Sequence, residues 1–210
     1  MPPVAQTAET AKTKGERTRQ ALLDGAIERF AADGFRATSL ADIARAANVT
    51  PAAAYAYFAN KEALFTEAVD TDAAGLIEDA VLPLLASGFH NDWAKLARAL
   101  TDGLDNHPLA RRLLAGLEPE FTERMLEIPA LTKLGDGLAM VLAAGQKIGE
   151  VRPDIDPATI AKGLEMTVMS LLIAGLQTGI APDSEQMAGV MAVLEAAVSA
   201  PKPAKRAKRD

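Results

Sequence analysis

Apolar residues recur at helical spacing along most of this 210-residue chain, and no segment shows the period-two alternation of a half-buried strand. The first clear stripe consists of Leu22, Leu23, Ala26, Ile27 and Phe30. Thr13 and Glu16 stand before it at the spacing of a capping box, and Gly34 follows it where helices commonly end. The pattern therefore predicts an all-α protein whose first helix runs from just after Thr13 to Gly34.

Two further helix starts follow in quick succession. Ser39 stands three residues before Asp42, so that each side chain can cover a free backbone N–H of the first helical turn. The apolar face of this helix consists of Leu40, Ile43, Ala44 and Ala47. Asn48 tolerates a left-handed backbone that stops a helix, Thr50 is a preferred N-cap, and Pro51 fits the first position of the next helix. Two short helices joined so tightly predict a helix-turn-helix, whose second helix can enter a DNA major groove.

The remaining pattern predicts further helices. Asn60 can cap a long helix from Lys61 to about Leu82, which Pro83 and residues 88–91 interrupt. Later helices are expected over residues 92–106, 108–117, 121–126, 130–148, 157–178 and 184–199. The last two are more apolar than one buried face requires, so we expect them to pack against a second copy of the chain. A four-helix bundle across a two-fold axis, with two helices from each protomer, would bury this surplus.

These elements divide the chain into a head, a body and two tails. We expect a helix-turn-helix domain over residues 13–69 and a helical ligand-binding and dimerisation domain over residues 70–200. Residues 1–12 lack periodicity and are expected to be disordered, as is the basic, proline-punctuated tail of residues 201–210. That tail can attract phosphate or simply keep the chain soluble.

The charge is segregated along the chain, although the net charge is −6. Between Lys12 and Lys61, eight basic residues stand against five acidic ones, which leaves +3. Residues 71–200 contain nine basic and eighteen acidic residues, which leaves −9. A mildly basic head on an acidic body is compatible with nucleic-acid binding, whereas the total alone argues against it.

Other function classes find little support. Cysteine is absent, which excludes disulfides and thiolate metal sites, and the N-terminus lacks the order of a secretory signal. The longest uncharged run, residues 166–182, is too short and too polar for a membrane span. The two histidines, His90 and His107, complete no metal or catalytic motif, and no phosphate-binding or nucleophile motif occurs. We therefore expect a cytoplasmic protein that is not an enzyme and that holds no cofactor and no metal.

The run D-I-A-x-x-A-x-V-T, which begins at Asp42, and the run A-Y-x-Y-F-x-N-K-E-x-L-F, which begins at Ala54, resemble the DNA-binding domain of the tetracycline-repressor (TetR) family. The resemblance covers about the first third of the chain and is specific, because a generic helix-turn-helix does not require the second run. It implies a transcriptional regulator that binds a near-palindromic DNA operator as a homodimer. It also implies a small-molecule inducer that binds among the middle helices of the body.

Carried over position by position, the resemblance assigns the DNA contacts. Base edges would be contacted from Thr50, Pro51, Ala52, Ala53 and Ala56. The DNA backbone would be held by Tyr55, Tyr57 and Lys61, helped by the helix start at Thr38 and Ser39. Several family members carry Lys, Gly, Thr and His where this chain has Pro51, Ala52, Ala53 and Ala56. Arg45 and Thr50 are thus the main side chains left for polar base contact, so methyl contacts and DNA shape must supply more of the specificity. The tyrosines could instead be partly buried in the helical core.

Candidate ligand contacts are large or polar side chains at helical spacing in the body. They are Trp93, Leu96, His107, Arg111, Leu114, Phe121, Met125, Met140, Met166 and Met169. Each of them can equally be ordinary core, since methionines and aromatic residues fill gaps. The sequence thus predicts a dimeric repressor that releases DNA when a small, largely apolar ligand binds. The alternative from another class is a helical ligand-binding or scaffold protein whose head contacts a protein instead of DNA.

Overall fold

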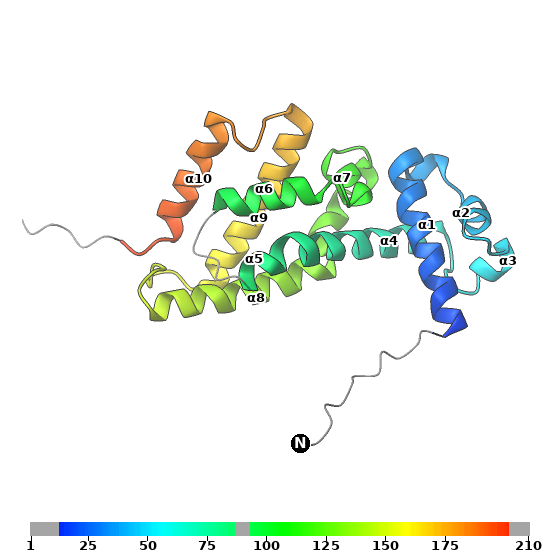
Figure 1. Cartoon of the computed structure of the whole chain (residues 1–210), viewed down its shortest axis with the longest axis horizontal. Coiled ribbons are helices and arrows are strands. Elements are labelled where there is room, and N and C mark those ends of the chain that lie inside the picture. The colour runs from blue at the N-terminus through cyan, green and yellow to red at the C-terminus, as the bar shows by residue number, and fades with distance from the viewer. Residues whose placement is uncertain (1–12, 87–92, 202–210) are drawn as a thin grey trace, which may run out of the picture. The chain divides into compact units, whose positions relative to one another are not determined.

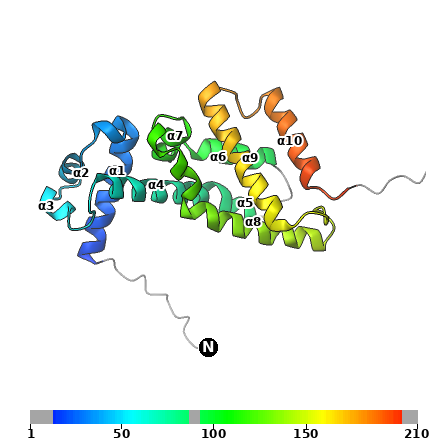
Figure 2. The same cartoon turned by 180° about the vertical axis from the view of Figure 1, so that it is seen from behind.

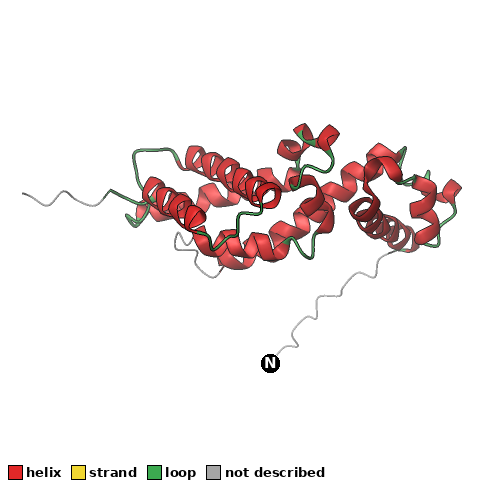
Figure 3. Cartoon of the chain, turned by 90° about the horizontal axis from the view of Figure 1, so that it is seen from above, coloured by secondary structure: helices red, strands yellow, loops and turns green. Residues whose placement is uncertain are grey.

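The computed structural model describes residues 13–86 and 93–201, with the side chains of Trp93 and Ala94 left undescribed. The tails predicted to be disordered therefore lie outside the described residues, except for Pro201. Within the described part the chain is helical, and its only β-type pairing is an isolated bridge between Val151 and Ser199 (Figures 1 and 3). This confirms the all-α prediction.

The chain forms two compact units that divide between Ala68 and Val69, inside one helix. The first unit, the head, contains α1 (Lys14–Ala37), α2 (Leu40–Ala46), α3 (Pro51–Ala54) and the start of α4 (Lys61–Leu76). The second unit, the body, contains the rest.

Local capping explains where the head helices begin. The Thr13 side chain accepts from the Glu16 N–H while the Glu16 carboxylate accepts from the Thr13 N–H, which completes the predicted capping box. At the other end the regular first part of α1 ends at Gly34, as predicted, because Gly34 takes a φ of 84° that breaks the helix. One further turn beyond this kink continues to Ala37. The Thr38 hydroxyl donates to the Gly34 carbonyl at 2.8 Å and thereby stabilises the kinked end.

An aromatic cluster forms the core of the head. Phe30 on α1 and Phe65 on α4 are fully buried and meet edge to face, with ring centroids 4.9 Å apart. Phe35 packs on Phe65 at 5.0 Å, also edge to face. Edge-to-face pairs add to the free energy of burial because the ring edges are positive and the faces negative. The cluster fixes α4 against α1 within the head.

The body begins with α4, whose last turns pass into a π-helical stretch, Ile77–Val81, and then into α5 (Leu82–Ala86). The prediction that Pro83 interrupts this helix is wrong. Proline has no N–H and its ring clashes with the carbonyl four residues earlier in a regular α-helix. The wider π turn, in which the Leu82 N–H bonds to the Ile77 carbonyl, changes the backbone spacing just before Pro83. The helix therefore passes through the proline instead of ending there.

The later helices lie close to their predicted ranges. They are α6 (Trp93–Gly103), α7 (Pro108–Leu114), α8 (Pro129–Lys147), α9 (Pro157–Thr178) and α10 (Glu185–Val198), with 3₁₀ turns at Pro119–Phe121 and Glu123–Glu127. Asp156 caps α9 and Ser184 caps α10 through their side-chain oxygens. Figures 1 and 2 show α9 and α10 joined by a turn at one end of the body.

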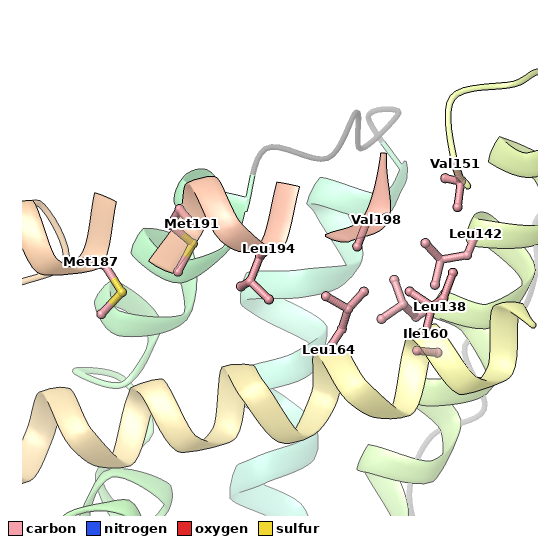
Figure 4. Close-up of a cluster of buried hydrophobic side chains, with 10 residues drawn as sticks. Leu138, Leu142, Val151, Ile160, Leu164, Met187, Met191, Leu194 and Val198 are labelled. Carbon is pink, nitrogen blue, oxygen red and sulfur yellow. The ribbon is translucent and has the colours of Figure 1, made fainter. Parts of the chain in front are cut away.

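Residues from α8, α9 and α10 share one apolar cluster. Figure 4 shows Leu138 and Leu142 of α8 beside Ile160 and Leu164 of α9, with side chains of α10 completing the cluster. By length and composition alone, residues 119–147 and α9 could also cross a membrane, yet only 17% of each apolar window is buried. The low burial shows that these helices carry more apolar surface than the described part of the chain covers.

A buried carboxylate joins α4 to α7. Asp72 is 5% exposed, and its Oδ2 accepts from the backbone N–H groups of Leu109 and Ala110 at 2.9 and 2.8 Å. Its Oδ1 lies 3.1 Å from Nδ1 of the buried His107. Gly75 makes room for this ring, since a β-carbon there would lie 2.7 Å from His107 Cε1. A side chain of α4 thus caps α7, for which His107, the residue at the cap position, supplies no side-chain hydrogen bond.

Asp72→Ala should lower the free energy of unfolding by about 3 kcal/mol, because two buried N–H groups and one imidazole lose their partner together. Urea unfolding followed by circular dichroism measures this change. Asp79→Ala is the matched control, since Asp79 also faces His107, at 3.4 Å from Nε2, but its side chain is 73% exposed. Equal effects of the two substitutions would contradict the capping role of Asp72.

Candidate nucleic-acid interface and body cavity

Three local interactions shape the helix-turn-helix. The Ser39 hydroxyl oxygen accepts from the Asp42 N–H at 3.1 Å and begins α2. Asn48 adopts a φ of 55°, the only positive φ of a non-glycine residue in the described part of the chain, and ends α2. The Thr50 hydroxyl oxygen accepts from the Ala53 N–H at 3.2 Å, with Pro51 at the first helical position. The predicted caps and turn are confirmed.

The start of α3 presents a small, smooth surface. Thr50, Pro51, Ala52 and Ala56 are exposed, while Ala53 is half-buried. Ala54 and, beyond the end of α3, Phe58 point into the head core, with 0% and 3% exposure. The exposed side chains offer methyl and methylene groups, and the Thr50 hydroxyl is the polar group among them. This surface can contact the floor of a groove closely but forms few hydrogen bonds.

Two tyrosines flank this surface in different settings. Tyr55 is 57% exposed, unusually open for a large aromatic side chain. Tyr57 is half-buried, with its hydroxyl near the start of α1: a β-carbon added at Gly15 would lie 3.8 Å from it. Tyr55 is therefore free to reach a phosphate, whereas Tyr57 also serves as packing for the head.

Arg45, the candidate for polar base contact, pairs with Asp42 one turn earlier on α2. The hydrogen bond from the Ser39 hydroxyl lowers the pKa of Asp42 most, and the Arg45 charge lowers that pKa further. The Arg45 side chain is 69% exposed, and an exposed ion pair of this kind contributes little to stability because solvent screens it. Arg45 can thus leave Asp42 for a base or phosphate at small cost.

Two of the predicted phosphate contacts are engaged within the head. The Lys61 ammonium donates to the Phe35 carbonyl at 2.9 Å and lies 4.1 Å from the Phe35 ring centroid. Thr38 is 2% exposed, and its hydroxyl bonds to α1. The Thr38 side chain therefore does not face solvent, and Lys61 meets a phosphate only if it shares or exchanges its present partner.

A further ion pair of the head could not be predicted from local sequence spacing. Arg19 on α1 bonds to Glu67 on α4, and its guanidinium lies 5.0 Å from the Phe58 ring centroid. The two residues are 48 positions apart, so no helical spacing connects them. In the same part of α1, Lys14 and Arg17 are exposed and add positive charge at the start of that helix.

The body contains a partly open apolar cavity of about 110 Å³. Its walls come from α4, the π turn, α5, α6, α7, the 3₁₀ turn before α8, α8 and α9. The described lining residues on the long helices include Val69, Ala73, Leu76, Leu138, Val168 and Leu172. A second cavity of about 100 Å³ lies between α6, α9 and α10, and Val168 and Leu172 face it as well. The body can therefore hold a small apolar molecule, which hydrophobic contact alone would bind without strong selectivity.

The structure brings four of the ten candidate ligand residues to the first cavity. These are Leu96, Leu114, Met125 and Met169. His107, Arg111, Phe121, Met140 and Met166 do not line it, and the Trp93 side chain lies outside the described part of the chain.

The candidates away from the cavity have other surroundings. His107 bonds to Asp72, and the exposed Arg111 pairs with Asp105 at 2.5 Å. Met140 and Met166 are 71% and 50% exposed. Periodicity placed them on apolar faces, but it could not distinguish a face turned to the core from one turned outward.

Sequence reasoning missed the one ionisable side chain among the described lining residues, Glu165 on α9. Burial raises the pKa of its carboxyl group, with the Lys162 charge opposing the shift. Glu165 is the single acidic residue of the apolar helix α9, and this isolated charge was the available sequence signal for it. In the described regions no three His, Cys, Asp or Glu side chains gather as metal ligands would.

Comparison with known proteins identifies close likenesses. The sequence model of the family described as "Bacterial regulatory proteins, tetR family" matches residues 22–68. The probable acrEF/envCD operon repressor of Escherichia coli K12 is 32% identical over 183 residues, which cover 82% of this chain and 78% of the relative. The uncharacterised regulator YdgC of Bacillus subtilis, an HTH-type transcriptional regulator, is 29% identical over 200 residues, 87% and 93% of the two chains. A TetR-family regulator from Cytophaga hutchinsonii shares the fold, with a TM-score of 0.71, 22% identity and coverage of 92% and 100%.

Replacing the residue that turns α2 into α3 tests the geometry of this site. Asn48→Ala should lower the free energy of unfolding by about 1 kcal/mol, since alanine tolerates the left-handed backbone poorly. Asn48→Gly is the matched variant and should unfold at or above the wild-type urea midpoint. Both are measured by urea unfolding. If alanine and glycine gave the same midpoint, the left-handed turn would not be under strain.

Proposed function

The chain belongs to the TetR family of bacterial transcriptional regulators, a non-enzymatic family, and from this we propose that it acts in the cytoplasm as a homodimeric repressor. The head binds a near-palindromic operator, and a small, largely apolar molecule in the body releases it. The observation that carries this proposal is the exposed face of Thr50, Pro51, Ala52, Tyr55 and Ala56 on a fully capped helix-turn-helix. That face lies within residues 22–68, the segment that matches the family.

DNA reading by this face relies on shape and methyl contact. Pro51, Ala52 and Ala56 carry no side-chain donor or acceptor, so they can touch thymine methyl groups but cannot select bases by hydrogen bonds. Thr50 can still donate its hydroxyl proton while its oxygen caps α3. Arg45 adds a polar contact if it leaves Asp42. The specificity of such a head depends strongly on the width and flexibility of the DNA.

Phosphate contacts position the head on the duplex. Tyr55 is open enough to donate to a phosphate oxygen, and the exposed Lys14 and Arg17 add positive charge. Ser39, at the start of α2, is exposed too. We assign Lys61 and Tyr57 a mixed role, in which they stabilise the head and contact phosphate at the same time. Binding of this kind weakens as the salt concentration rises.

Dimerisation accounts for the apolar surface that one protomer leaves open. On α9, Gly163 and Met166 face outward, and on α10 so do Gly189, Ala192 and Val193, the last with 68% exposure. A β-carbon at either glycine would meet nothing within 4 Å in the protomer, so the fold itself does not require glycine there. Small residues on outward faces allow helices of a partner to approach closely. We therefore place the two-fold interface on α9 and α10.

Ligand control follows from α4, which belongs to both units. Residues 61–68 of α4 form part of the head, while Val69, Ala73 and Leu76 line the cavity. A ligand that binds the cavity better in one arrangement of α4 than in another shifts the population of DNA-competent dimers. A ligand with equal affinity for both arrangements would shift nothing.

Selection of bound fragments from a random duplex DNA pool tests the proposed function, and a near-palindrome with half-sites about one helical turn apart is the expected result. Ala52→Arg should then change the recovered sequence, because it adds a base-reading donor to the exposed face. Tyr55→Phe is the control, and should weaken binding to specific and random DNA alike by about tenfold through loss of one charged hydrogen bond. An unchanged sequence preference for Ala52→Arg would show that α3 does not read the groove.

Val193→Arg should convert the dimer to monomers, since it would bury a charge in the α10 interface. Sedimentation velocity of the full chain measures the outcome. Met140→Arg makes the same chemical change at a position on α8 that is 71% exposed, and it should leave the dimer intact. Dissociation by Met140→Arg but not by Val193→Arg would move the interface away from α10.

A further inference from the structure

One ionisable side chain lines the cavity among aliphatic residues. Glu165 on α9 is half-buried, forms no hydrogen bond or ion pair with the described part of the chain, and is affected by the charge of Lys162. We propose that the ligand is a lipophilic cation, whose apolar part fills the Leu- and Met-lined cavity and whose positive charge pairs with the Glu165 carboxylate. This inference rests on the proposed function, because it specifies the chemical class of the ligand of the same cavity.

The neighbouring helix leaves space for this carboxylate. Gly135 on α8 also lines the cavity, and a β-carbon there would lie 3.2 Å from Glu165 Oε2, closer than side-chain atoms normally approach. Glycine inside a helix makes that helix less stable than alanine would. The conformation of Gly135 does not require glycine, since its φ is not positive. Gly135 therefore makes room for the Glu165 carboxylate at the cavity wall.

Electrostatics favours a cation over an anion at this position. Burial raises the pKa of Glu165, which means that the charged carboxylate is poorly solvated in the cavity wall. The positive charge of Lys162, one turn earlier on α9, lowers the pKa of Glu165 and so opposes the effect of burial, but the Lys162 side chain is exposed to solvent. A cation in the cavity would place a positive charge on the apolar side of this carboxylate, whereas a fatty carboxylate would add a second negative charge beside the first.

The apolar lining determines which apolar groups the ligand can carry. Leu96, Leu114, Met125 and Met169 come from four different elements and surround the cavity with flexible or aliphatic side chains. Such walls bind alkyl or aromatic groups of several shapes, because methionine in particular adapts to irregular surfaces. Selectivity must therefore come mainly from charge. Without Glu165, the same cavity should accept neutral and charged amphiphiles with little preference.

Isothermal titration calorimetry of the full-length protein, refolded to remove any bound small molecule, tests this inference with three probes that share one chain length. The probes are octyltrimethylammonium, 1-octanol and octanoate, below their micelle concentrations. We expect the cation to bind at least about tenfold more tightly than octanoate, and Glu165→Gln to weaken the cation by about tenfold while octanol changes little. Glu150→Gln is the matched control, because Glu150 is exposed and lies outside the cavity.

Equal binding of cation and octanoate, or undiminished cation binding by Glu165→Gln, would overturn the assignment of a cationic ligand. The same protein samples are tested for DNA binding with the selected operator, so the two proposals can fail separately. Operator binding that other compounds release but the cation does not would refute only the ligand class. Cation binding that depends on Glu165 in a protein that selects no DNA would refute the regulator proposal and leave the site.

Discussion

The body depends on one buried carboxylate that links two distant parts of the chain. Asp72 accepts from two backbone N–H groups at the start of α7, and it also pairs with His107, although it lies 35 residues before that histidine. An uncapped helix start in the interior would leave these groups without partners. Asp72 therefore fixes the position of α7 on α4. Since α7 supplies Ala110, Leu113 and Leu114 to the cavity wall, the shape of the cavity follows from the same contact.

The head uses the same principle with positive charges. Lys61 holds the Phe35 carbonyl near the end of α1, and Arg19 joins α1 to α4 through Glu67. Both charged groups also pack on aromatic rings, which stabilises them further. These contacts order the frame on which α3 is mounted. The protein thus uses part of its basic charge to build the head, and the exposed Lys14, Arg17 and Tyr55 are the side chains that we propose contact the DNA backbone.

What the sequence could predict depended on how far apart the interacting residues lie. The caps at Thr13, Ser39 and Thr50 each involve a partner three residues later, so a local pattern was enough, and the helix-turn-helix followed from them. The passage of a helix through Pro83 depended on a π turn that no pattern announces. Four of ten candidate ligand residues line the cavity, because periodicity finds an apolar face but not what covers it. Glu165 was missed for a related reason, since its surroundings come from residues far away in sequence.

The position of α4 connects these features to regulation. Within one helix it carries Phe65 of the head core, Val69 and Ala73 of the cavity wall, and Asp72, which caps α7. Packed aromatic clusters and satisfied buried carboxylates tolerate few intermediate arrangements, because small displacements leave voids or unpaired polar groups. We therefore propose that a ligand that fills the cavity favours one complete set of contacts over another instead of bending α4 gradually, which is the property that a two-state switch between DNA-bound and released forms requires.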